Sequence, residues 1–376
     1  MNKFLRTIDQ LATGFLAVIL LAVAWSPGAE AATRKVKCGK DDLQKVITAA
    51  VSGDTIEITG ICQGNYRIDG KDLTLVGAAT AGPHGIKGVA TDIAALTISR
   101  SNNTQLQNLS FSDGAFWGVH AEYSLFTMSN CTVSRNAHNG VNLSNSSRLD
   151  GDHLVFEGNA RGALYAGRSS YADCEECDFI ANVAFAAVSN WGSLVTLLDS
   201  VVTGRAGISA SNGSYIDLDC ASFDLSDDCS LHATEIAGQA SSGSTVSFYG
   251  AGEFWGQVQA ADRSQAQLYG ARQQSTGVIR DDSHTNPGPN STPRSNLVGD
   301  NSSLRVEPWD DTEAGSSRLM GTTEVATFSH ALLYADSAGG DSALVGALNC
   351  GSGGDAWVDA GVDLTAGSIT GCDHAE

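Results

Sequence analysis

Four stretches of the chain decide the fold: residues 124–134 read SLFTMSNCTVS, 147–157 SRLDGDHLVFE, 170–180 SYADCEECDFI and 193–203 SLVTLLDSVVT. Each begins with Ser, carries Phe or Val nine residues later, and starts 23 residues after the one before. The Ser positions form a column that extends to Asn102 and Ser214. The Phe/Val positions form a second column that extends to Phe111 and Phe223. A fixed period of this length is typical of stacked repeats, in which each unit buries its apolar side chains against its neighbours.

Each unit is predicted to contain short strands, because apolar and polar residues alternate with a period of two. A Gly-apolar pair such as Gly140-Val141, Gly162-Ala163 or Gly207-Ile208 follows the Phe/Val column and indicates a third strand. Between them, Asn136, Asn159 and Asn182 recur every 23 residues. Asn tolerates the left-handed backbone of a tight turn, and its amide can bond the Asn above and below. The pattern predicts a parallel β-helix, with two further coils beginning near Ser244 and Ser264.

The chain before the repeats is predicted to cover the first coil with a short helix. Asp42 can cap its N-terminus, and the apolar positions Leu43, Val46, Ile47 and Ala50 fall on one face. Gly53 ends it. An uncovered first rung would expose unpaired strand edges, so a covering helix is expected there.

At this point the chain resembles a known group. Residues 43–47 (LQKVI), 53–56 (GDTI), 65–68 (NYRI) and 73–77 (LTLVG) resemble the opening of right-handed parallel β-helix proteins of the pectin-lyase-like superfamily. The Asn column resembles that superfamily's Asn ladder, and the resemblance covers residues 38–285. It implies an all-β, right-handed solenoid. The superfamily holds lyases, hydrolases, epimerases, adhesins and tailspikes, and the catalytic motifs of its polygalacturonases, pectate lyases and epimerases are absent here, so no chemistry is selected.

The sequence predicts five segments. Residues 1–31 are expected to be a signal peptide, since Lys3 and Arg6 precede an apolar run and Ala29-Glu30-Ala31 fits a cleavage site. Residues 32–95 form the N-terminal cap and first coils, and 96–285 the parallel β-helix. Residues 286–305 form a linker, and 306–376 a non-repeat C-terminal cap or appendage. The protein is therefore expected to be secreted or periplasmic, with no membrane span after signal removal.

Nine cysteines in an exported chain suggest disulfides, although sequence alone does not assign them. The local pairs Cys38–Cys62, Cys220–Cys229 and Cys350–Cys372 are the plausible ones. Cys174 and Cys177 form a C-x-x-C pair with no βαβ pattern around it, which favours a structural role over a redox role. Cys131 and Cys177 share a column and are two coils apart, so about 10 Å separates them. That distance is too long for a disulfide, and Cys131 is predicted to be a buried free thiol.

The charge excludes one class of function. The chain has 42 acidic and 22 basic residues, a net charge of −20. No basic stripe is available to displace counterions from a phosphate backbone, so the protein is not expected to bind nucleic acid.

The candidate site lies on the strand that opens each repeat. If offsets two and four from the Ser column point inward, offsets one, three and five point outward. The outward positions carry six carboxylates, two tyrosines and an arginine: Asp150, Asp152, Asp173, Glu175, Asp217, Asp219, Tyr171, Tyr215 and Arg148. By resemblance this strand corresponds to the sheet whose outer face carries the substrate groove in many superfamily enzymes.

Carboxylates this close repel, and a bound cation, a raised proton affinity or solvent could relieve the repulsion. Asp150, Asp152, Asp173 and Glu175 are therefore candidate calcium ligands and, since paired carboxylates perform glycoside hydrolysis, candidate catalytic residues. The remaining members, Arg148, Tyr171, Tyr215, Asp217 and Asp219, are candidate substrate-binding residues. The plainer interpretation is that these charges keep an exposed sheet soluble.

The leading hypothesis is an exported β-helix that binds extracellular polysaccharide or a cell-surface glycan through this acidic face. If it is also an enzyme, it is expected to be a polysaccharide lyase or a glycoside hydrolase. The alternative is a non-catalytic surface, adhesion or structural protein. Calcium is the only cofactor that the residues indicate.

Overall fold

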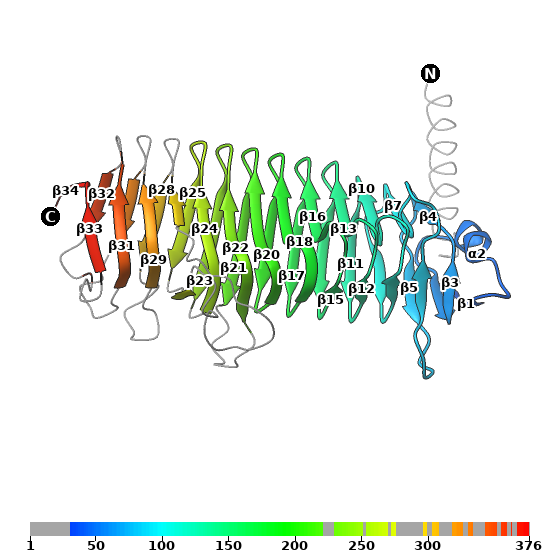
Figure 1. Cartoon of the computed structure of the whole chain (residues 1–376). Coiled ribbons are helices and arrows are strands. Elements are labelled where there is room, and N and C mark those ends of the chain that lie inside the picture. The colour runs from blue at the N-terminus through cyan, green and yellow to red at the C-terminus, as the bar shows by residue number, and fades with distance from the viewer. Residues whose placement is uncertain are drawn as a thin grey trace, which may run out of the picture.

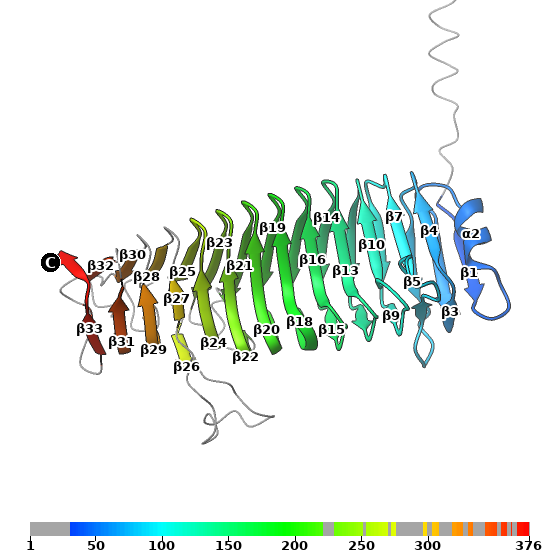
Figure 2. The same ribbon diagram turned by 45° about the horizontal axis from the view of Figure 1, so that its top comes forward.

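The computed structural model describes residues 31–220, 229–250, 253–269, 272–275, 296–298, 303–307, 318–325, 330–333, 343–351, 355–358, 362 and 367–375. These residues form one long stack of coils, with α2 (Leu43–Ala49) at one end and the strands of residues 367–375 at the other (Figures 1 and 2). The predicted signal peptide, residues 1–31, lies outside the described part except for Ala31.

Two parallel sheets run along the stack. The strand order of sheet A follows the chain, whereas sheet B begins as two parallel ladders that alternate along the chain and join at one long strand. Sheet A contains 15 strands: β1 (Thr33–Lys37), β2 (Thr55–Thr59), β5 (Thr74–Gly77), β8 (Thr104–Gln107), β11 (Leu125–Ser129), β14 (Arg148–Asp152), β17 (Tyr171–Glu175), β19 (Leu194–Leu198), β21 (Tyr215–Cys220), β23 (Thr245–Gly250), β25 (Gln265–Tyr269), β28 (Ser303–Glu307), β30 (His330–Leu333), β32 (Asp355–Val358) and β34 (Asp373–Ala375).

Sheet B contains 19 strands: β3 (Ile61–Gln63), β4 (Tyr66–Asp69), β6 (Gly85–Lys87), β7 (Leu96–Ser99), β9 (Ser110–Ser112), β10 (Val119–Glu122), β12 (Thr132–Ser134), β13 (Asn139–Ser144), β15 (Val155–Glu157), β16 (Gly162–Gly167), β18 (Asp178–Asn190), β20 (Val201–Ser211), β22 (Ser230–Ala240), β24 (Glu253–Ala260), β26 (Arg272–Ser275), β27 (Asn296–Val298), β29 (Arg318–Val325), β31 (Ala343–Cys350) and β33 (Gly367–Thr370). The predicted three strands per coil hold up to β16. From β18 to β24 the second and third strands merge into one long strand with register shifts.

The buried Phe/Val column forms as predicted. Phe111, Val133, Phe156, Phe179 and Val202 pair in register from coil to coil, and each is 0% exposed. The rings of Phe156 and Phe179 stack with centroids 4.8 Å apart. In the next coil the described strand places Leu231 opposite Val202, while the predicted Phe223 lies outside the described residues. Bulky apolar side chains thus fill a continuous dry interior, the main stabilising term for stacked coils.

The Asn ladder also forms. Asn136 Nδ2 donates to Asn159 Oδ1 at 3.0 Å, and Asn159 Nδ2 donates to Asn182 Oδ1 at 3.0 Å. Each amide also donates to a backbone carbonyl beneath it, as Asn159 does to Val133 at 2.9 Å. The left-handed backbone is at the preceding residue in each coil, Arg135, Gly158 and Ala181, rather than at the Asn itself.

The N-terminal cap agrees with its prediction. Helix α2 begins after Asp42, whose Oδ1 accepts from the Lys45 amide at 3.1 Å, and it buries Leu43 and Ile47. Figure 1 places α2 against the first strands of the stack.

The C-terminal part differs from the prediction. The segments proposed as a linker (286–305) and as a non-repeat cap or appendage (306–376) contribute described strands to both sheets. β28, β30, β32 and β34 pair in parallel one after another beyond β25, and β27, β29, β31 and β33 do the same in sheet B. The apolar inward positions persist there, as at Leu304, Ala331 and Ala356, but the spacing between them in the sequence varies, which hides the period.

Four disulfides join the described cysteines: Cys38–Cys62, Cys220–Cys229, Cys350–Cys372 and Cys174–Cys177. Cys174–Cys177 is fully buried within one coil, as suits a structural bond. Cys131 is a buried free thiol, and burial raises its pKa to about 11, so it stays protonated and unreactive.

Candidate functional site on the outer face of sheet A

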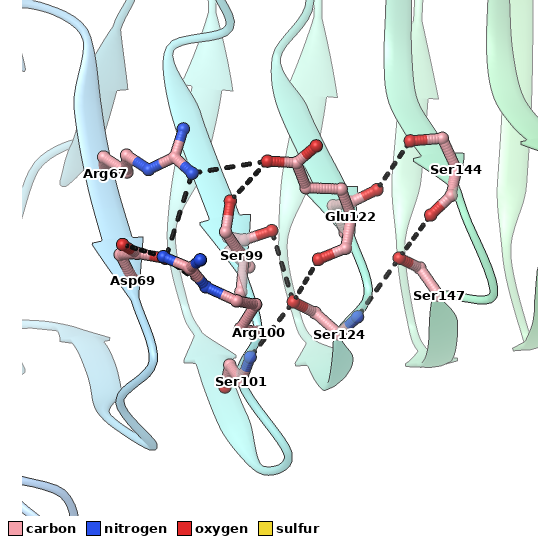
Figure 3. Close-up of polar contacts among 11 residues, drawn as sticks. Arg67, Asp69, Ser99, Arg100, Ser101, Glu122, Ser124, Ser144 and Ser147 are labelled. Carbon is pink, nitrogen blue, oxygen red and sulfur yellow. Dashed lines mark hydrogen bonds and ion pairs between the residues drawn. The ribbon is translucent and has the colours of Figure 1, made fainter.

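A buried ladder of serines fixes where each strand of sheet A begins. Ser124 Oγ accepts from the Ser101 amide at 3.2 Å, and Ser147 Oγ accepts from the Ser124 amide at 3.3 Å (Figure 3). The same bond continues through Ser170, Ser193, Ser214, Ser244 and Ser264. The first member is Ser101 rather than the predicted Asn102, since the chain has an extra residue before β8. By fixing the strand starts, the ladder decides which side chains face outward.

The charged residues beside this ladder on sheet B are already paired. Glu122 Oε1 accepts from Ser99 Oγ at 2.9 Å and from Arg67 Nη2 at 3.3 Å, and Arg100 pairs with Asp69 (Figure 3). The outer face of sheet A is different, because its carboxylates outnumber its cations.

The predicted outward residues do face outward. Pairing between β14, β17, β19 and β21 aligns them in three files along the stack: Arg148–Tyr171–Leu194–Tyr215, Asp150–Asp173–Thr196–Asp217 and Asp152–Glu175–Leu198–Asp219. The coil that carries Thr196 and Leu198 therefore separates the six carboxylates into a group of four and a group of two. The predicted residues form two neighbouring sites and not one.

Arg148 and Tyr171 form the centre of the first site. The Arg148 guanidinium carbon lies 4.8 Å from the centroid of the Tyr171 ring, and the Tyr171 hydroxyl donates to Asp173 Oδ2 at 3.3 Å. A cation over an aromatic face is held by the ring's electrostatic field, which orders both side chains. Burial raises the pKa of Tyr171, and the Asp173 charge adds to this, so the phenol stays a donor.

A shallow depression of about 210 Å³ adjoins Arg148. It is lined by Asn102, Asn103, Leu125, Phe126, Thr127, Arg148 and Asp150. Leu125 is 43% exposed, which is unusual for leucine and gives the depression an apolar wall. The sequence alone did not point to Asn102 and Asn103 as site residues, because they belong to the turn that has no equivalent in later coils.

The four candidate calcium ligands are not gathered around one point. Within the described ranges, no group of three or more His, Cys, Asp and Glu side chains is arranged to hold a metal ion. Two of the four carboxylates have other partners: Asp152 contacts His153 Nδ1 at 2.6 Å, and Asp173 accepts from Tyr171. Side chains of parallel strands project side by side instead of converging, so Asp150, Asp152, Asp173 and Glu175 do not surround one point.

His153 also lies at this site. Its two ring nitrogens lie 2.6 Å from Asp152 Oδ1 and 2.6 Å from Glu176 Oε2. The hydrogen bond that His153 donates to Asp152 raises the pKa of His153, and the charges of Asp152, Glu176 and Glu175 raise it further. Protonated His153 thus neutralises part of the acidic face.

The second site contains Asp217, Asp219 and Tyr215 on β21. Burial raises the pKa of Asp217 to about 8, and the neighbouring Asp219 charge adds to the shift. Asp217 Oδ1 is buried and has no hydrogen-bond partner among the described residues. The Tyr215 hydroxyl donates to Ser247 Oγ at 3.1 Å, and burial raises its pKa. Near neutral pH, Asp217 is therefore a proton donor beside a second carboxyl group.

Comparisons with known proteins bear on the fold. A family model described as a right-handed beta helix region matches residues 90–223. No curated protein matches the chain significantly. Within the described ranges, no helix is long and apolar enough to cross a lipid bilayer.

Two solved structures align with 93% of this chain. One is the catalytic unit of a thermostable GH87 alpha-1,3-glucanase from Streptomyces thermodiastaticus strain HF3-3, with 10% identity, 70% of that chain covered and a TM-score of 0.28. The other is the catalytic domain of a GH87 alpha-1,3-glucanase variant in complex with tetrasaccharides, with 9% identity, 69% coverage and a TM-score of 0.24. Similarity this low adds nothing to the assignment. The parallel coils and the buried Phe/Val column show that the chain is a parallel β-helix, and residues 90–223 match the model of a right-handed one.

Proposed function

We propose that this protein is an exported glycan-binding protein, which holds an uncharged polysaccharide chain along the outer face of sheet A. The observation that carries the proposal is the Arg148 guanidinium held over the Tyr171 ring beside the depression. A sugar ring has an apolar face and a rim of hydroxyls. An ordered aromatic ring, an arginine and asparagine amides supply both kinds of contact in one place.

The charge of the face selects the glycan. Asp150, Asp173 and Glu175 lie within two coils of the depression, and like charges across an interface are unfavourable. A polyuronate would be repelled, whereas a neutral chain would accept hydrogen bonds from the arginine and donate them to the carboxylates. The depression is smaller than an enclosed ligand pocket. It therefore suits one part of a long chain that lies across an open surface.

The test is a binding panel of neutral α-glucan, neutral β-glucan, xylan and polygalacturonate, measured by affinity electrophoresis and calorimetry. At least one neutral glycan should bind, and polygalacturonate should not compete with it. Arg148→Ala and Tyr171→Ala should each weaken binding at least tenfold. The matched controls are Arg205→Ala, an arginine paired with Glu235, and Tyr165→Ala on sheet B; both should bind as the unmodified protein does. Equal binding by the Arg148 and Tyr171 variants would remove the site.

A second candidate function, hydrolysis of the bound glycan, rests on Asp217 and Asp219. They are two residues apart on one strand, about 6.5–7 Å, which lies at the short end of the carboxylate separation in inverting glycosidases. Protonated Asp217 would give its proton to the leaving oxygen, and Asp219 would take a proton from the attacking water. The glycosidic bond breaks, and one water is consumed.

Product analysis after long incubation tests this chemistry. Asp217→Asn and Asp219→Asn should each abolish products while glycan binding is kept. Binding without products from the unmodified protein would leave a non-catalytic glycan-binding protein. Absence of both binding and products across the panel would favour the surface, adhesion or structural alternative.

A further inference from the structure

Three successive turns on the other side of the stack bring together a tryptophan, a histidine and an arginine. Trp117 lies between β9 and β10, His138 between β12 and β13, and Arg161 between β15 and β16. The backbone aligns these turns, since the His138 amide donates to the Phe116 carbonyl at 3.3 Å and the Arg161 amide to the His138 carbonyl at 3.4 Å. Phe116, His138 and Arg161 therefore occupy one file, one coil apart.

This cluster contains more hydrogen-bond donors than acceptors. Trp117 Nε1 donates to His138 Nδ1 at 2.8 Å, and Arg161 Nη1 lies 2.7 Å from His138 Nε2. Trp and Arg side chains can only donate, and a neutral imidazole has a single acceptor nitrogen. Whichever nitrogen accepts, the other carries a hydrogen that faces another donor. The pKa of His138 is lowered, first by burial and then by the Arg161 charge, so the imidazole stays neutral and its single acceptor cannot serve both donors.

Arg161, like Arg148 and Arg168, differs from the described arginines that pair with a carboxylate. Arg34, Arg67, Arg100, Arg135 and Arg205 each pair with a carboxylate. Arg161 is exposed and makes no ion pair within the described residues, where its side chain contacts His138 instead. In a protein with a net charge of −20, this is a local cationic group with unused donors.

An aromatic wall adjoins the donors. The Phe116 and Trp117 ring centroids are 4.2 Å apart, and the Phe116 and His138 centroids are 4.9 Å apart. Both Phe116 and Trp117 are half-buried and thus leave part of each ring accessible. A ligand whose charged group met Arg161 and His138 could place its body against these rings.

The Asn ladder holds these turns in position. Asn136 Oδ1 accepts from the Gly114 amide at 3.1 Å, and Asn136 Nδ2 donates to the Phe111 carbonyl at 3.0 Å. Asn136 and Asn159 are at most 1% exposed. The donors are therefore carried on turns that are fixed from beneath, so little ordering is required when a ligand binds.

From this donor excess beside an aromatic wall, we propose that Arg161, His138 and Trp117 form a binding site for the carboxylate of a ring-bearing organic acid, such as an acidic sugar. The carboxylate oxygens would accept from Arg161 and from the His138 N–H that now faces it, as charge-assisted bonds. The ring would pack beside Phe116 and Trp117. This site shares no residue with the depression on sheet A and has the opposite charge preference, so it stands without the proposed function.

Calorimetric titration with D-glucuronate, benzoate, acetate and D-glucose tests the site in the intact protein. Glucuronate or benzoate should bind, acetate should bind at least fivefold more weakly, and glucose should not bind. Arg161→Gln should weaken binding at least tenfold, and Arg161→Lys by less. The matched control, Arg168→Gln, changes an exposed arginine that donates to Asn145 and should have no effect.

Two further measurements distinguish binding at this site from a general effect of the substitutions on the protein. Trp117→Phe should weaken binding and abolish the change in tryptophan fluorescence on titration, because the indole lies against the bound ring. Since Arg161 is exposed, Arg161→Gln should keep the melting temperature of the unmodified protein. No binding of either ring-bearing acid, or equal binding by Arg161→Gln, would overturn the proposal. Acetate binding as tightly as both ring-bearing acids would also overturn it, since the aromatic wall would then contribute nothing.

Discussion

At the scale of single residues, Asp217 makes the clearest prediction about pH. Its pKa is about 8 in the folded protein against 3.8 in a model peptide, so the folded state keeps a proton that the unfolded state loses. Stability is then fully present below pH 3.8 and declines as the pH rises towards 8. Asp217→Asn cannot ionise and should remove this decline.

The variant should therefore match the unmodified protein near pH 4 and exceed its unfolding free energy by roughly 2–3 kcal/mol at pH 8, a value reduced for partial solvent screening. Urea unfolding at the two pH values measures the difference. Asp150→Asn, on the exposed part of β14, is the matched control and should leave the pH dependence unchanged. A stability difference that did not change with pH would show that Asp217 is ionised in the folded protein.

Asn159 is the second residue whose removal has a defined cost. It is fully buried, accepts from the Asn136 backbone and side-chain amides at 3.2 and 3.0 Å, and donates to Val133 and Asn182. Asn159→Ala would leave several buried polar groups without partners and should cost roughly 3–5 kcal/mol of unfolding free energy. Asn103→Ala, at an exposed position, should change it by less than about 0.5 kcal/mol. A small effect at Asn159 would mean that water replaces the ladder.

The sequence predicted the buried positions better than the surface contacts, for a physical reason. Side chains that recur in the dry interior, such as Phe156 and Asn159, are set by the repeat itself and were placed correctly. Surface partners such as His153 and Trp117 depend on rotamers and on neighbours one coil away, and the period carries no information about them. For the same reason the four carboxylates suggested a calcium site, although their side chains project in parallel and two of them, Asp152 and Asp173, have other partners.

At the scale of secondary-structure elements, a side chain of α2 makes the hydrogen bonds with the first coil that a neighbouring strand would make. The Gln44 side chain accepts from the Arg67 amide at 2.8 Å and donates to the Arg67 carbonyl at 3.0 Å, so it pairs with the free edge of β4. Lys71 Nζ donates to the carbonyls of Ile47, Thr48 and Ala50 at the end of the helix. An edge covered in this way resists pairing with another chain.

Lys71→Met should therefore loosen the cap without affecting the middle of the stack. Three carbonyls at the helix C-terminus lose their donor, at a cost of roughly 1–2 kcal/mol. Hydrogen exchange should accelerate at α2 and β4 and remain unchanged from β14 to β19. The matched control is Lys45→Met on the same helix, which loses only an exposed contact with Asp42 at 3.7 Å. Equal exchange in both variants would show that Lys71 does not support the cap.

At the scale of the whole molecule, stacking makes stability a sum of neighbouring terms, so the ends should unfold first. The sequence predicted the repeat between residues 96 and 285 but not the coils that continue beyond it. The inward apolar positions persist at Leu304, Ala331 and Ala356, but they lack the constant sequence spacing on which the prediction depended. A buried column can therefore be recognised in a sequence only where consecutive coils contain nearly the same number of residues.

Two of the four disulfides lie where end-unfolding would begin. Cys38–Cys62 joins the residue after β1 to β3, and Cys350–Cys372 joins the last residue of β31 to the turn between β33 and β34. Their sequence separations of 24 and 22 residues are about one coil, so each bond ties a terminal coil to the next. Closing a loop of that size stabilises the folded state by roughly 3 kcal/mol in the chain-entropy description.

Replacing either pair by serine should therefore fray its own end and leave the other end intact. Cys38→Ser/Cys62→Ser should speed hydrogen exchange in β1 and β2, and Cys350→Ser/Cys372→Ser should do so in β31 and β33. The central strands should keep their protection in both variants, because each coil is stabilised by its immediate neighbours. The control is Cys131→Ser, a buried free thiol whose loss should affect β11 and β12 but neither end. Loss of protection along the whole stack from one terminal disulfide would mean that the coils unfold as a single cooperative unit, and nearest-neighbour stacking would not describe this protein.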